Sequence, residues 1–285
     1  MSAIEQSATR VFGTTVAQRA DVASIVSLIA MWLAATVAAQ PPLRVCADPN
    51  NLPFSNDRGE GFENRIAELI AHDLGQPLTY TWSPQRRGFI RNTLNARRCD
   101  VVIGVPAGFP LARTTRPYYR STYVFVTRHD RRPPITSFDD PQLRRLTIGI
   151  QITGDDYNNP PPAMALASRQ LVDNIRGFTV YGNYADAAPQ RAIIDAVADR
   201  RVDVAIAWGP LAGYFATREP VRLDISPVSP ALAAPGVPFA FDIAIGVRRD
   251  DVKLAATVDA ALVRQRDAIH RVLERYHVPL VQSLQ

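Results

Sequence analysis

The sequence predicts an α/β fold of two lobes, each a mostly parallel sheet flanked by helices, with two chain crossings between the lobes. Short apolar runs alternate with segments of helical periodicity early in the chain, and the same rhythm returns after residue 146. Strands that alternate with helices form parallel sheets, because each helix returns the chain to the edge where the previous strand began. Two extended runs, at residues 122–128 and 235–245, supply the crossings.

The first lobe is predicted from a strand–helix–strand–helix–strand order. The apolar run LRVCA ends at turn residues that begin with Asp48. Apolar residues then recur at helical spacing up to Leu74, and Gly75 is a candidate C-cap. The predicted elements are strands over residues 43–47, 78–82 and 100–105 and helices over residues 62–74 and 88–96.

The second lobe is predicted from strands over residues 147–151 and 203–207 and a helix over residues 189–200. Closing helices over residues 252–276 are expected to pack back on the first lobe. The expected division of the chain is a signal peptide at 1–39, the first lobe at 40–128 with its return at 240–285, and the second lobe at 129–239.

An internal echo supports two related lobes. Residues 90–103 and 193–206 both contain a helix, two arginines, one further residue, an aspartate and an apolar strand. Cations suit the negative end of a helix dipole, which is the structural role we expect for these arginines. The matched polar residues are Arg97, Arg98 and Asp100 in the first copy and Arg200, Arg201 and Asp203 in the second.

The composition is that of a globular protein. The chain has 285 residues, 47% hydrophobic and 21% charged, with a formal net charge of +5. This length suits two compact units. Lys253 is the one lysine, and the arginines are scattered along the sequence without interleaved aromatic residues. We therefore expect no nucleic-acid partner.

No arrangement of residues typical of a catalytic or cofactor site occurs in the sequence. Its four histidines are dispersed, and none has a Ser, Cys or carboxylate at motif spacing. Glycine-rich nucleotide motifs and the H-E-x-x-H zinc motif are absent from it as well. We therefore expect no enzymatic activity, no cofactor and no metal.

The N-terminal segment has the pattern of a signal peptide. Residues 24–39 are apolar but short for a membrane span, and small residues precede Gln40. Cleavage there would export the protein to the periplasm with no stable membrane insertion. The long preceding region carries Glu5 and Asp21, which leaves two alternatives, a start site further downstream or an uncleaved anchor.

The two cysteines, Cys46 and Cys99, are expected to form a disulfide. Neither lies in a metal-binding spacing. An exported protein folds in an oxidising compartment, where paired cysteines are the rule. The alternative is that each is a small buried hydrophobic residue.

Several segments resemble the type 2 periplasmic substrate-binding proteins. The segments GFENRIAELIAHDLG, RPYYRSTYVFVTR and RRVDVAIA resemble that family's first helix, its Pro-Tyr-Tyr segment before the hinge and its Gly-Arg-Val-Asp-Ala strand. Together they cover about residues 43–280. The resemblance implies a type 2 binding-protein fold with a cleft between the lobes.

A narrower resemblance is to the branch associated with quinoprotein dehydrogenases, the MoxJ/XoxJ-type proteins. It rests on LRVCADPNNLPFSN, CDVVIGVPAGF, TTRPYYRSTYVFV and IAWGPLAGYF. The resemblance implies a partner role in activation or maturation of a PQQ-dependent methanol dehydrogenase, the lanthanide-dependent enzymes included. The dehydrogenase's cytochrome c is a further implied partner.

The charged groups that amino-acid binders of this family use are missing. Those binders place an arginine nine residues before the Pro of the Pro-Tyr segment, where this chain has Gly108, with Arg113 nearby but out of register. They end the Val-Asp-Ala strand on an aspartate, where this chain has Trp208. Near the helix after the first crossing, Asp155 and Asp156 either cap that helix or form a weak cation site.

The strand ends therefore define a candidate cleft that is rich in aromatic residues. It could bind a planar or apolar molecule, or a partner's side chain, and Trp208 could instead pack in the core. An alternative function is a receptor of an ABC uptake transporter for a small ligand other than an α-amino acid. The candidate cleft residues are Asp48, Asn51, Phe54, Gly108, Phe109, Arg113, Tyr118, Thr153, Asp155, Asp156, Trp208 and Tyr214.

Overall fold

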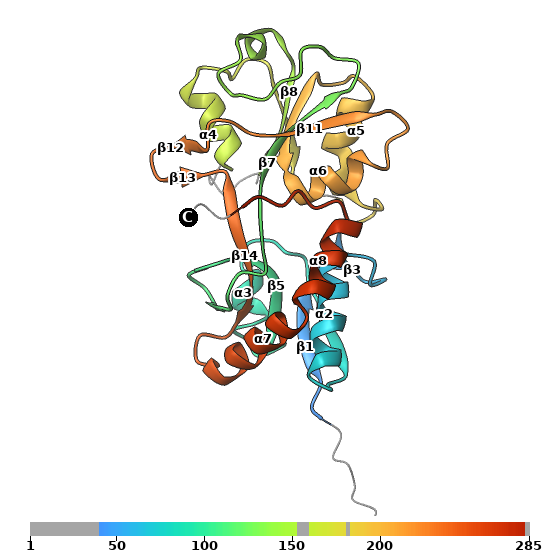
Figure 1. Cartoon of the computed structure of the whole chain (residues 1–285), viewed down its shortest axis with the longest axis vertical. Helices are drawn as coiled ribbons and strands as arrows, with labels where there is room; N and C mark the ends of the chain where they lie inside the picture. The colour runs from blue at the N-terminus through green and yellow to red at the C-terminus, as the bar shows by residue number, and fades with distance from the viewer. Residues whose placement is uncertain (1–39, 153–159, 181–182, 283–285) are drawn as a thin grey trace, which may run out of the picture. The chain divides into compact units, whose positions relative to one another are not determined.

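The computed structural model describes residues 40–152, 160–180 and 183–282. The expected signal peptide at 1–39 lies outside these residues. One mixed sheet runs through the described part, and two of its strands pass from one lobe to the other (Figure 1). This confirms the predicted α/β class with two crossings. The lobe boundaries given above stay a prediction.

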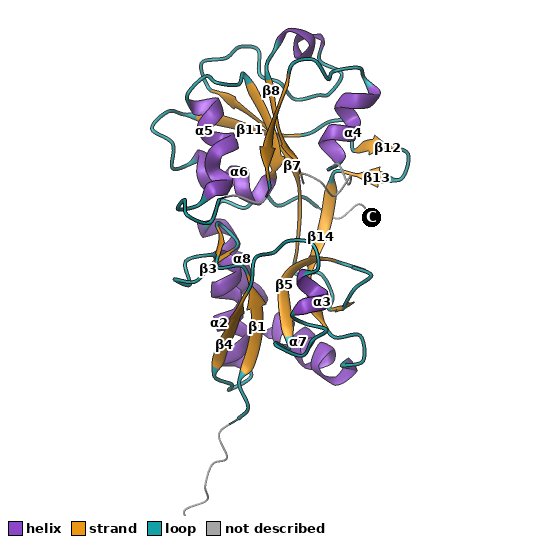
Figure 2. Cartoon of the chain, turned by 180° about the vertical axis from the view of Figure 1, so that it is seen from behind, coloured by secondary structure: helices purple, strands orange, loops and turns teal. Residues whose placement is uncertain are grey.

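The first lobe is a sheet covered on both faces. Strand β1 (Leu43–Ala47) lies parallel between β4 (Leu78–Trp82) and β5 (Val101–Pro106), and β14 (Ala240–Val247) is antiparallel to β5. Helices α2 (Phe62–Asp73), α7 (Val252–Arg264) and α8 (Arg266–Arg275) pack on one face, which confirms the expected return of the closing helices. Helix α3 (Phe89–Asn92) packs on the other (Figure 2). The short strands β2 (Asn50–Asn51), β3 (Ser55–Asn56) and β6 (Arg113–Thr114) complete this lobe.

The second lobe has the same plan. Strand β8 (Ile148–Ile152) lies parallel between β10 (Val204–Trp208) and β9 (Ile175–Thr179). The crossing strand β7 (Tyr119–Arg128) is antiparallel to both β10 and β11 (Leu223–Pro227). The remaining elements are the α-helices α4 (Pro161–Ser168), α5 (Ala192–Ala198) and α6 (Gly209–Ala216), the 3-10 helices η1 (Pro141–Arg145) and η2 (Pro189–Arg191), and the hairpin of β12 (Leu232–Ala234) and β13 (Val237–Pro238).

The predicted helix over residues 62–74 is confirmed, whereas the one over 88–96 is too long. Phe62, Ile66 and Ile70 follow one another at four-residue spacing and are buried, so burial stabilises α2 along its whole length. Helix α3 instead ends at Asn92. The Thr93 hydroxyl donates to the Phe89 carbonyl at 2.6 Å, and the Thr93 backbone leaves the helical region.

The sequence echo is also a structural echo. Arg97 and Arg200 both adopt the left-handed backbone conformation, with φ of 58° and 60°. The aspartate three residues later accepts the backbone N–H at the start of the neighbouring parallel strand, from Arg44 to Asp100 and from Thr147 to Asp203. The two lobes therefore end a helix and begin a strand in the same way.

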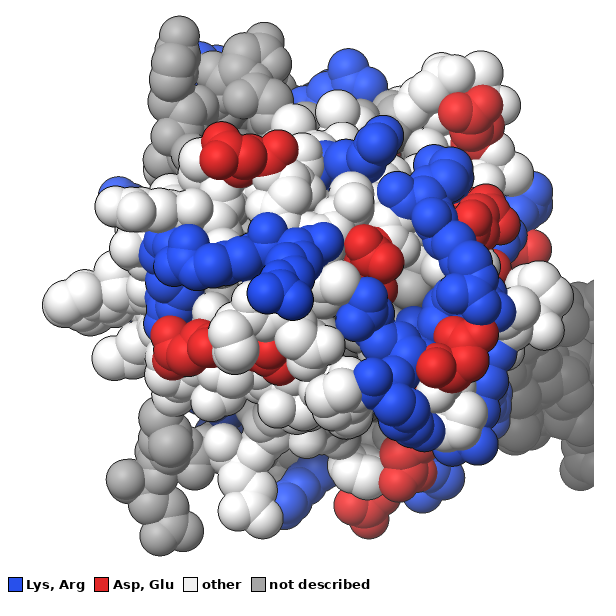
Figure 3. All heavy atoms as spheres, turned by 90° about the horizontal axis from the view of Figure 1, so that it is seen from above, with Lys and Arg blue, Asp and Glu red and all other residues white. Residues whose placement is uncertain are grey.

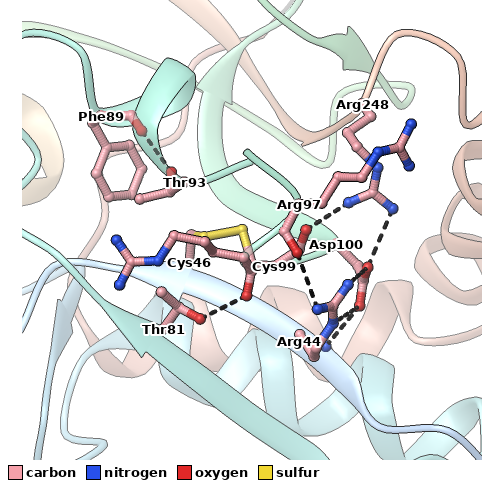
Figure 4. Close-up of a disulfide and its surroundings, with 10 residues drawn as sticks. Arg44, Cys46, Thr81, Phe89, Thr93, Arg97, Cys99, Asp100 and Arg248 are labelled. Atoms are coloured by element: carbon pink, nitrogen blue, oxygen red, sulfur yellow. Dashed lines mark hydrogen bonds and ion pairs between the residues drawn. A yellow bond between two sulfur atoms is a disulfide. The ribbon is translucent and has the colours of Figure 1, made fainter. Parts of the chain in front are cut away.

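The predicted disulfide is confirmed. Cys46 of β1 and Cys99, just before β5, are bonded, with Cα atoms 5.5 Å apart. Both side chains are buried under α3. Beside them Asp100 binds Arg44 at 2.6 Å and Arg248 at 3.2 Å (Figure 4). Burial opposes ionisation of Asp100, but the hydrogen bonds from the two arginines outweigh it and lower the pKa of its carboxyl.

Candidate functional site

A cavity of about 750 Å³ lies where strands of the two lobes end. Its walls come from the carboxyl ends of β5, β8 and β10 and from both crossing strands, the position at which open α/β sheets bind ligands. None of the described residues of the wall is charged. They are Asn51, Phe54, Gly104, Pro106, Phe109, Tyr123, Gln151, Pro160, Val180, Gln190, Trp208, Leu211, Phe241 and Ile243.

Trp208 forms one wall of this cavity. It is the last residue of β10, paired with Tyr123 of β7, and the two rings lie 5.3 Å apart at 65°. The ring of Phe241 in β14 lies 6.0 Å from the indole, at 64°. The Trp208 backbone N–H donates to the side-chain oxygen of Gln151 at 3.3 Å. The indole is therefore held by both crossing strands and remains half-buried.

Two glycines after Trp208 bring α6 close to the rest of the molecule. A Cβ atom on Gly209 would lie 2.6 Å from the carbonyl oxygen of Thr122 in β7. A Cβ atom on Gly213, one turn later, would overlap the carbonyl oxygen of His277. A larger residue at 209 would push α6 away from β7, and one at 213 would push it away from the segment after α8. These glycines therefore set the position of the Trp208 ring.

One polar atom in the wall has no partner. Gln190 of η2 is 6% exposed, and its amide nitrogen donates to the Asn50 carbonyl at 2.8 Å. Its side-chain oxygen, also buried, has no hydrogen-bond partner in the described structure. An unmatched buried acceptor is costly, so this oxygen favours a ligand that carries an N–H or O–H group.

A buried carboxyl lies behind the wall at Gly104. The bulge in β5 gives Gly104 a φ of +82°, and a Cβ atom there would overlap Oε1 of Glu63 in α2. Glu63 is 9% exposed, and no described residue donates a hydrogen bond to its carboxyl. Burial without a partner raises the pKa of Glu63 well above its ordinary value.

Asp48 joins the two lobes rather than lining the cavity. Its carboxylate accepts from the backbone N–H groups of Asn50 at 2.8 Å and Gln85 at 2.6 Å and from the Tyr184 hydroxyl at 2.5 Å. Burial and the Asp48 contact raise the pKa of Tyr184. Asn50 also donates to the Asp186 carbonyl at 2.8 Å. These bonds tie the segment after β1 to the segment before η2.

The other predicted cleft residues divide into three groups. Asn51, Phe54, Phe109 and Trp208 line the cavity. Thr153, Asp155 and Asp156 lie outside the described residues. Gly108, Arg113, Tyr118 and Tyr214, like Asp48, do not line it.

Local contacts explain why this last group lies elsewhere. Gly108 is exposed in a turn and donates to the Thr114 hydroxyl at 3.1 Å. Arg113 donates to the Arg249 carbonyl at 3.0 Å. Tyr118 lines a separate groove beside α7 and α8. Tyr214 stacks on Tyr276, with ring centroids 5.5 Å apart.

Several wall residues were not predicted from the sequence, among them Tyr123, Gln151, Gln190 and Phe241. Tyr123 and Phe241 lie in the two predicted crossing strands. Residues on one face of a strand alternate along it, so Tyr123 could have been found by pairing its strand with the one that ends at Trp208. No local pattern marks Gln190, which reaches the cavity through tertiary contacts.

The described residues contain no group of three or more His, Cys, Asp or Glu side chains that could hold a metal ion. No helix among them is long and apolar enough to cross a membrane.

Two α/β lobes joined by two crossing strands beside a cavity define a type 2 periplasmic binding protein. The chain belongs to the MoxJ family of these proteins. It is 33% identical to protein MoxJ of Methylorubrum extorquens AM1 over 257 residues, which cover 87% of this chain and 85% of the relative. The match confirms the narrower of the two resemblances seen in the sequence.

Solved structures agree with this assignment. The periplasmic binding protein XoxJ from Methylobacterium extorquens AM1 is 35% identical, with a TM-score of 0.70 over 85% of this chain and 100% of that one. MxaJ from Methlophaga aminisulfidivorans MPT is 26% identical, with a TM-score of 0.71 over 84% of this chain and 100% of that one. No family model matches the sequence.

Proposed function

We propose that this chain is a non-catalytic periplasmic accessory protein that aids activation or maturation of a PQQ-dependent methanol dehydrogenase. Membership of the MoxJ family supports the role. The observation that carries it is the aromatic wall of the cavity, in which no described residue is charged. An α-amino acid needs an anion clamp and a cation partner, and the positions that would supply them hold Gly108 and Trp208.

The aromatic wall is suited to hold an apolar side chain of the dehydrogenase. Trp and Tyr are frequent anchors of protein interfaces, because they bury a large area at small entropic cost. Trp208, Tyr123 and Phe241 come from three strands that meet at the hinge. A partner bound there would therefore also bias the relative position of the lobes.

Co-purification from the periplasm of the native organism tests this function. Tagged chain is expected to retain the dehydrogenase and its cytochrome c, and adding purified chain to newly assembled dehydrogenase is expected to raise its activity. The mature chain should begin at Gln40 by N-terminal sequencing. Absence of a complex, together with unchanged dehydrogenase activity, would contradict the proposal.

A second candidate is a receptor for a small, uncharged planar molecule. The buried side-chain oxygen of Gln190, which has no hydrogen-bond partner in the described structure, favours this candidate. A ligand with an N–H or O–H group could donate to this oxygen, whereas an apolar side chain could not. Calorimetry and thermal-shift screening with uncharged aromatic metabolites would detect it as a rise in melting temperature. Gln190→Leu should abolish that rise if the acceptor binds the ligand, whereas Gln142→Leu, on η1, should not.

A further inference from the structure

The strands of the second lobe present one common edge on the side away from the cavity. Strands β8, β9, β10 and β11 begin there, and β7 ends there, because β7 is antiparallel to its two neighbours. Leu223, which begins β11, lies opposite Arg128, and Val204, which begins β10, lies opposite Ile148. Five residues of strand span about 16 Å, which separates this edge from Trp208 at the far end of β10.

Arginines that lie scattered along the sequence come together at this edge. Viewed from above, their side chains form bands interrupted by isolated carboxylates (Figure 3). Eight arginines and five aspartates make the edge net positive. We call it the distal arginine face: Arg128, Arg131, Arg132, Arg144, Arg145, Arg200, Arg201 and Arg222, with Asp130, Asp173, Asp199, Asp203 and Asp224.

Carboxylates hold several of these arginines in place. Asp130 binds Arg200 at 2.6 Å and Arg128 at 3.3 Å, and Asp203 binds Arg131 at 3.4 Å. These residues line a groove of about 390 Å³. Arginines held in this way lose less conformational freedom when they bind a further carboxylate.

The adjacent Arg144 and Arg145, at the end of η1, differ from these. Both are exposed, and neither forms an ion pair or hydrogen bond with any described residue. At the equivalent corner of the first lobe, Arg97 pairs with Asp250 and Asp100 pairs with Arg44. Arg144 and Arg145 therefore neutralise no carboxylate among the described residues.

We propose that the distal arginine face is a docking surface for a carboxylate-bearing face of a partner protein. Its identification with the dehydrogenase rests on the proposed function. Interleaved carboxylates fit a protein surface with charges at defined positions, whereas a uniformly anionic membrane or nucleic acid would meet repulsion at each aspartate. Docking at this edge leaves the cavity, at the other end of the strands, free for a second contact.

Charge reversal at the two arginines without partners tests the proposal. Arg144→Glu/Arg145→Glu is expected to weaken binding to the purified dehydrogenase about tenfold or more and to flatten its dependence on salt. The control is Arg271→Glu/Arg275→Glu, two exposed arginines of α8 without partners among the described residues, which changes the net charge equally. Circular dichroism checks that both variants fold. A photo-crosslinker at position 145 or 271 then maps the contact in the native periplasm.

The outcomes separate this inference from the proposed function. Crosslinks from position 145 to an acidic segment of the dehydrogenase support both. The crosslinks can instead lead to an acidic segment of another identified protein, whose binding the charge reversal weakens. That result supports the distal arginine face as a docking surface and overturns its assignment to the dehydrogenase. If the charge reversal leaves the dehydrogenase complex unaffected, the docking surface is overturned and the proposed function is not. Binding only to phosphatidylglycerol vesicles, or to nothing, overturns the protein docking site.

Discussion

Trp208 and Tyr123 form a cross-strand aromatic pair, with ring centroids 5.3 Å apart at 65°, at the point where the second lobe meets a crossing strand. Edge-to-face geometry of this kind adds about 0.5–1.5 kcal/mol beyond the area it buries. The pair links the wall of the cavity to the strand that connects the lobes. A molecule that contacts the indole thus contacts the hinge.

The indole is expected to matter for binding more than for folding. Trp208→Ala should weaken the dehydrogenase complex by a hot-spot amount, about 2 kcal/mol, measured by calorimetry. Because Trp208 is half-buried, the loss of stability should be below the about 3–5 kcal/mol of a core tryptophan. Trp82→Ala is the control, since Trp82 is also half-buried but stacks on Tyr80 outside the cavity. Equal binding by both variants would place the partner elsewhere.

Gly104 is expected to tolerate no side chain. Gly104→Ala adds a Cβ atom into the Glu63 carboxyl and also requires a left-handed backbone. Gly59→Ala isolates the second effect, because Gly59 has a φ of +71° and nothing within 4 Å of the added atom. We expect a loss of about 1–2 kcal/mol for Gly59→Ala and a clearly larger one for Gly104→Ala, measured by urea unfolding. Similar losses would show that Glu63 moves aside freely.

Glu63 should make the protein less stable as the pH rises. Its pKa is raised in the folded state, so the folded protein holds this proton to a higher pH than the unfolded chain. The contribution of Glu63 to the free energy of unfolding is complete below the pKa of about 4.3 that the carboxyl has in the unfolded chain. Above that pH it falls by about 1.4 kcal/mol per pH unit, until the pH reaches the pKa of Glu63 in the folded protein.

Glu63→Gln should remove this slope from the pH profile of the urea midpoint. Glu68→Gln, an exposed position on the same helix, should keep it. A profile that Glu63→Gln leaves unchanged would mean that the carboxyl is ionised in the folded protein.

The disulfide should contribute substantially to stability. It joins residues 53 apart in the sequence, for which the chain-entropy model gives about 4 kcal/mol. Cys46→Ala/Cys99→Ala should lower the unfolding midpoint by a corresponding amount, with a native circular dichroism spectrum. Alkylation of unreduced wild-type protein, followed by intact mass, should modify no thiol. Two modified thiols would contradict the bond.

Much of the fold was predictable because its signals are local. The strands at 43–47 and 78–82 and helix α2 follow from periodicity and flanking turn residues. Helix α4 and strand β9 were not predicted. The residues at 160–168 are rich in Pro and Ala, and the run IRGFT is partly exposed, so neither segment shows the periodicity of a helix or of a strand. Their neighbours in the tertiary structure select them.

The candidate site was predictable only in part. Trp208, Phe54 and Phe109 could be placed because they follow strands or turns that the sequence marks. Tyr123 could have been placed only by pairing its strand with the one that ends at Trp208. Phe241 could not, since the sequence does not say which face of its crossing strand meets the cavity.

The sequence by itself determined the alternation of strands and helices, the two crossings, the one possible cysteine pair and the absence of the amino-acid clamp at Gly108 and Trp208. Tertiary structure alone decided that Glu63 is buried behind Gly104, that Gln190 reaches the cavity and that arginines from residues 128–222 share one edge. The reason is physical. Periodicity and turn chemistry act between near neighbours in the chain, whereas burial and charge convergence depend on segments that only the packed sheet brings together.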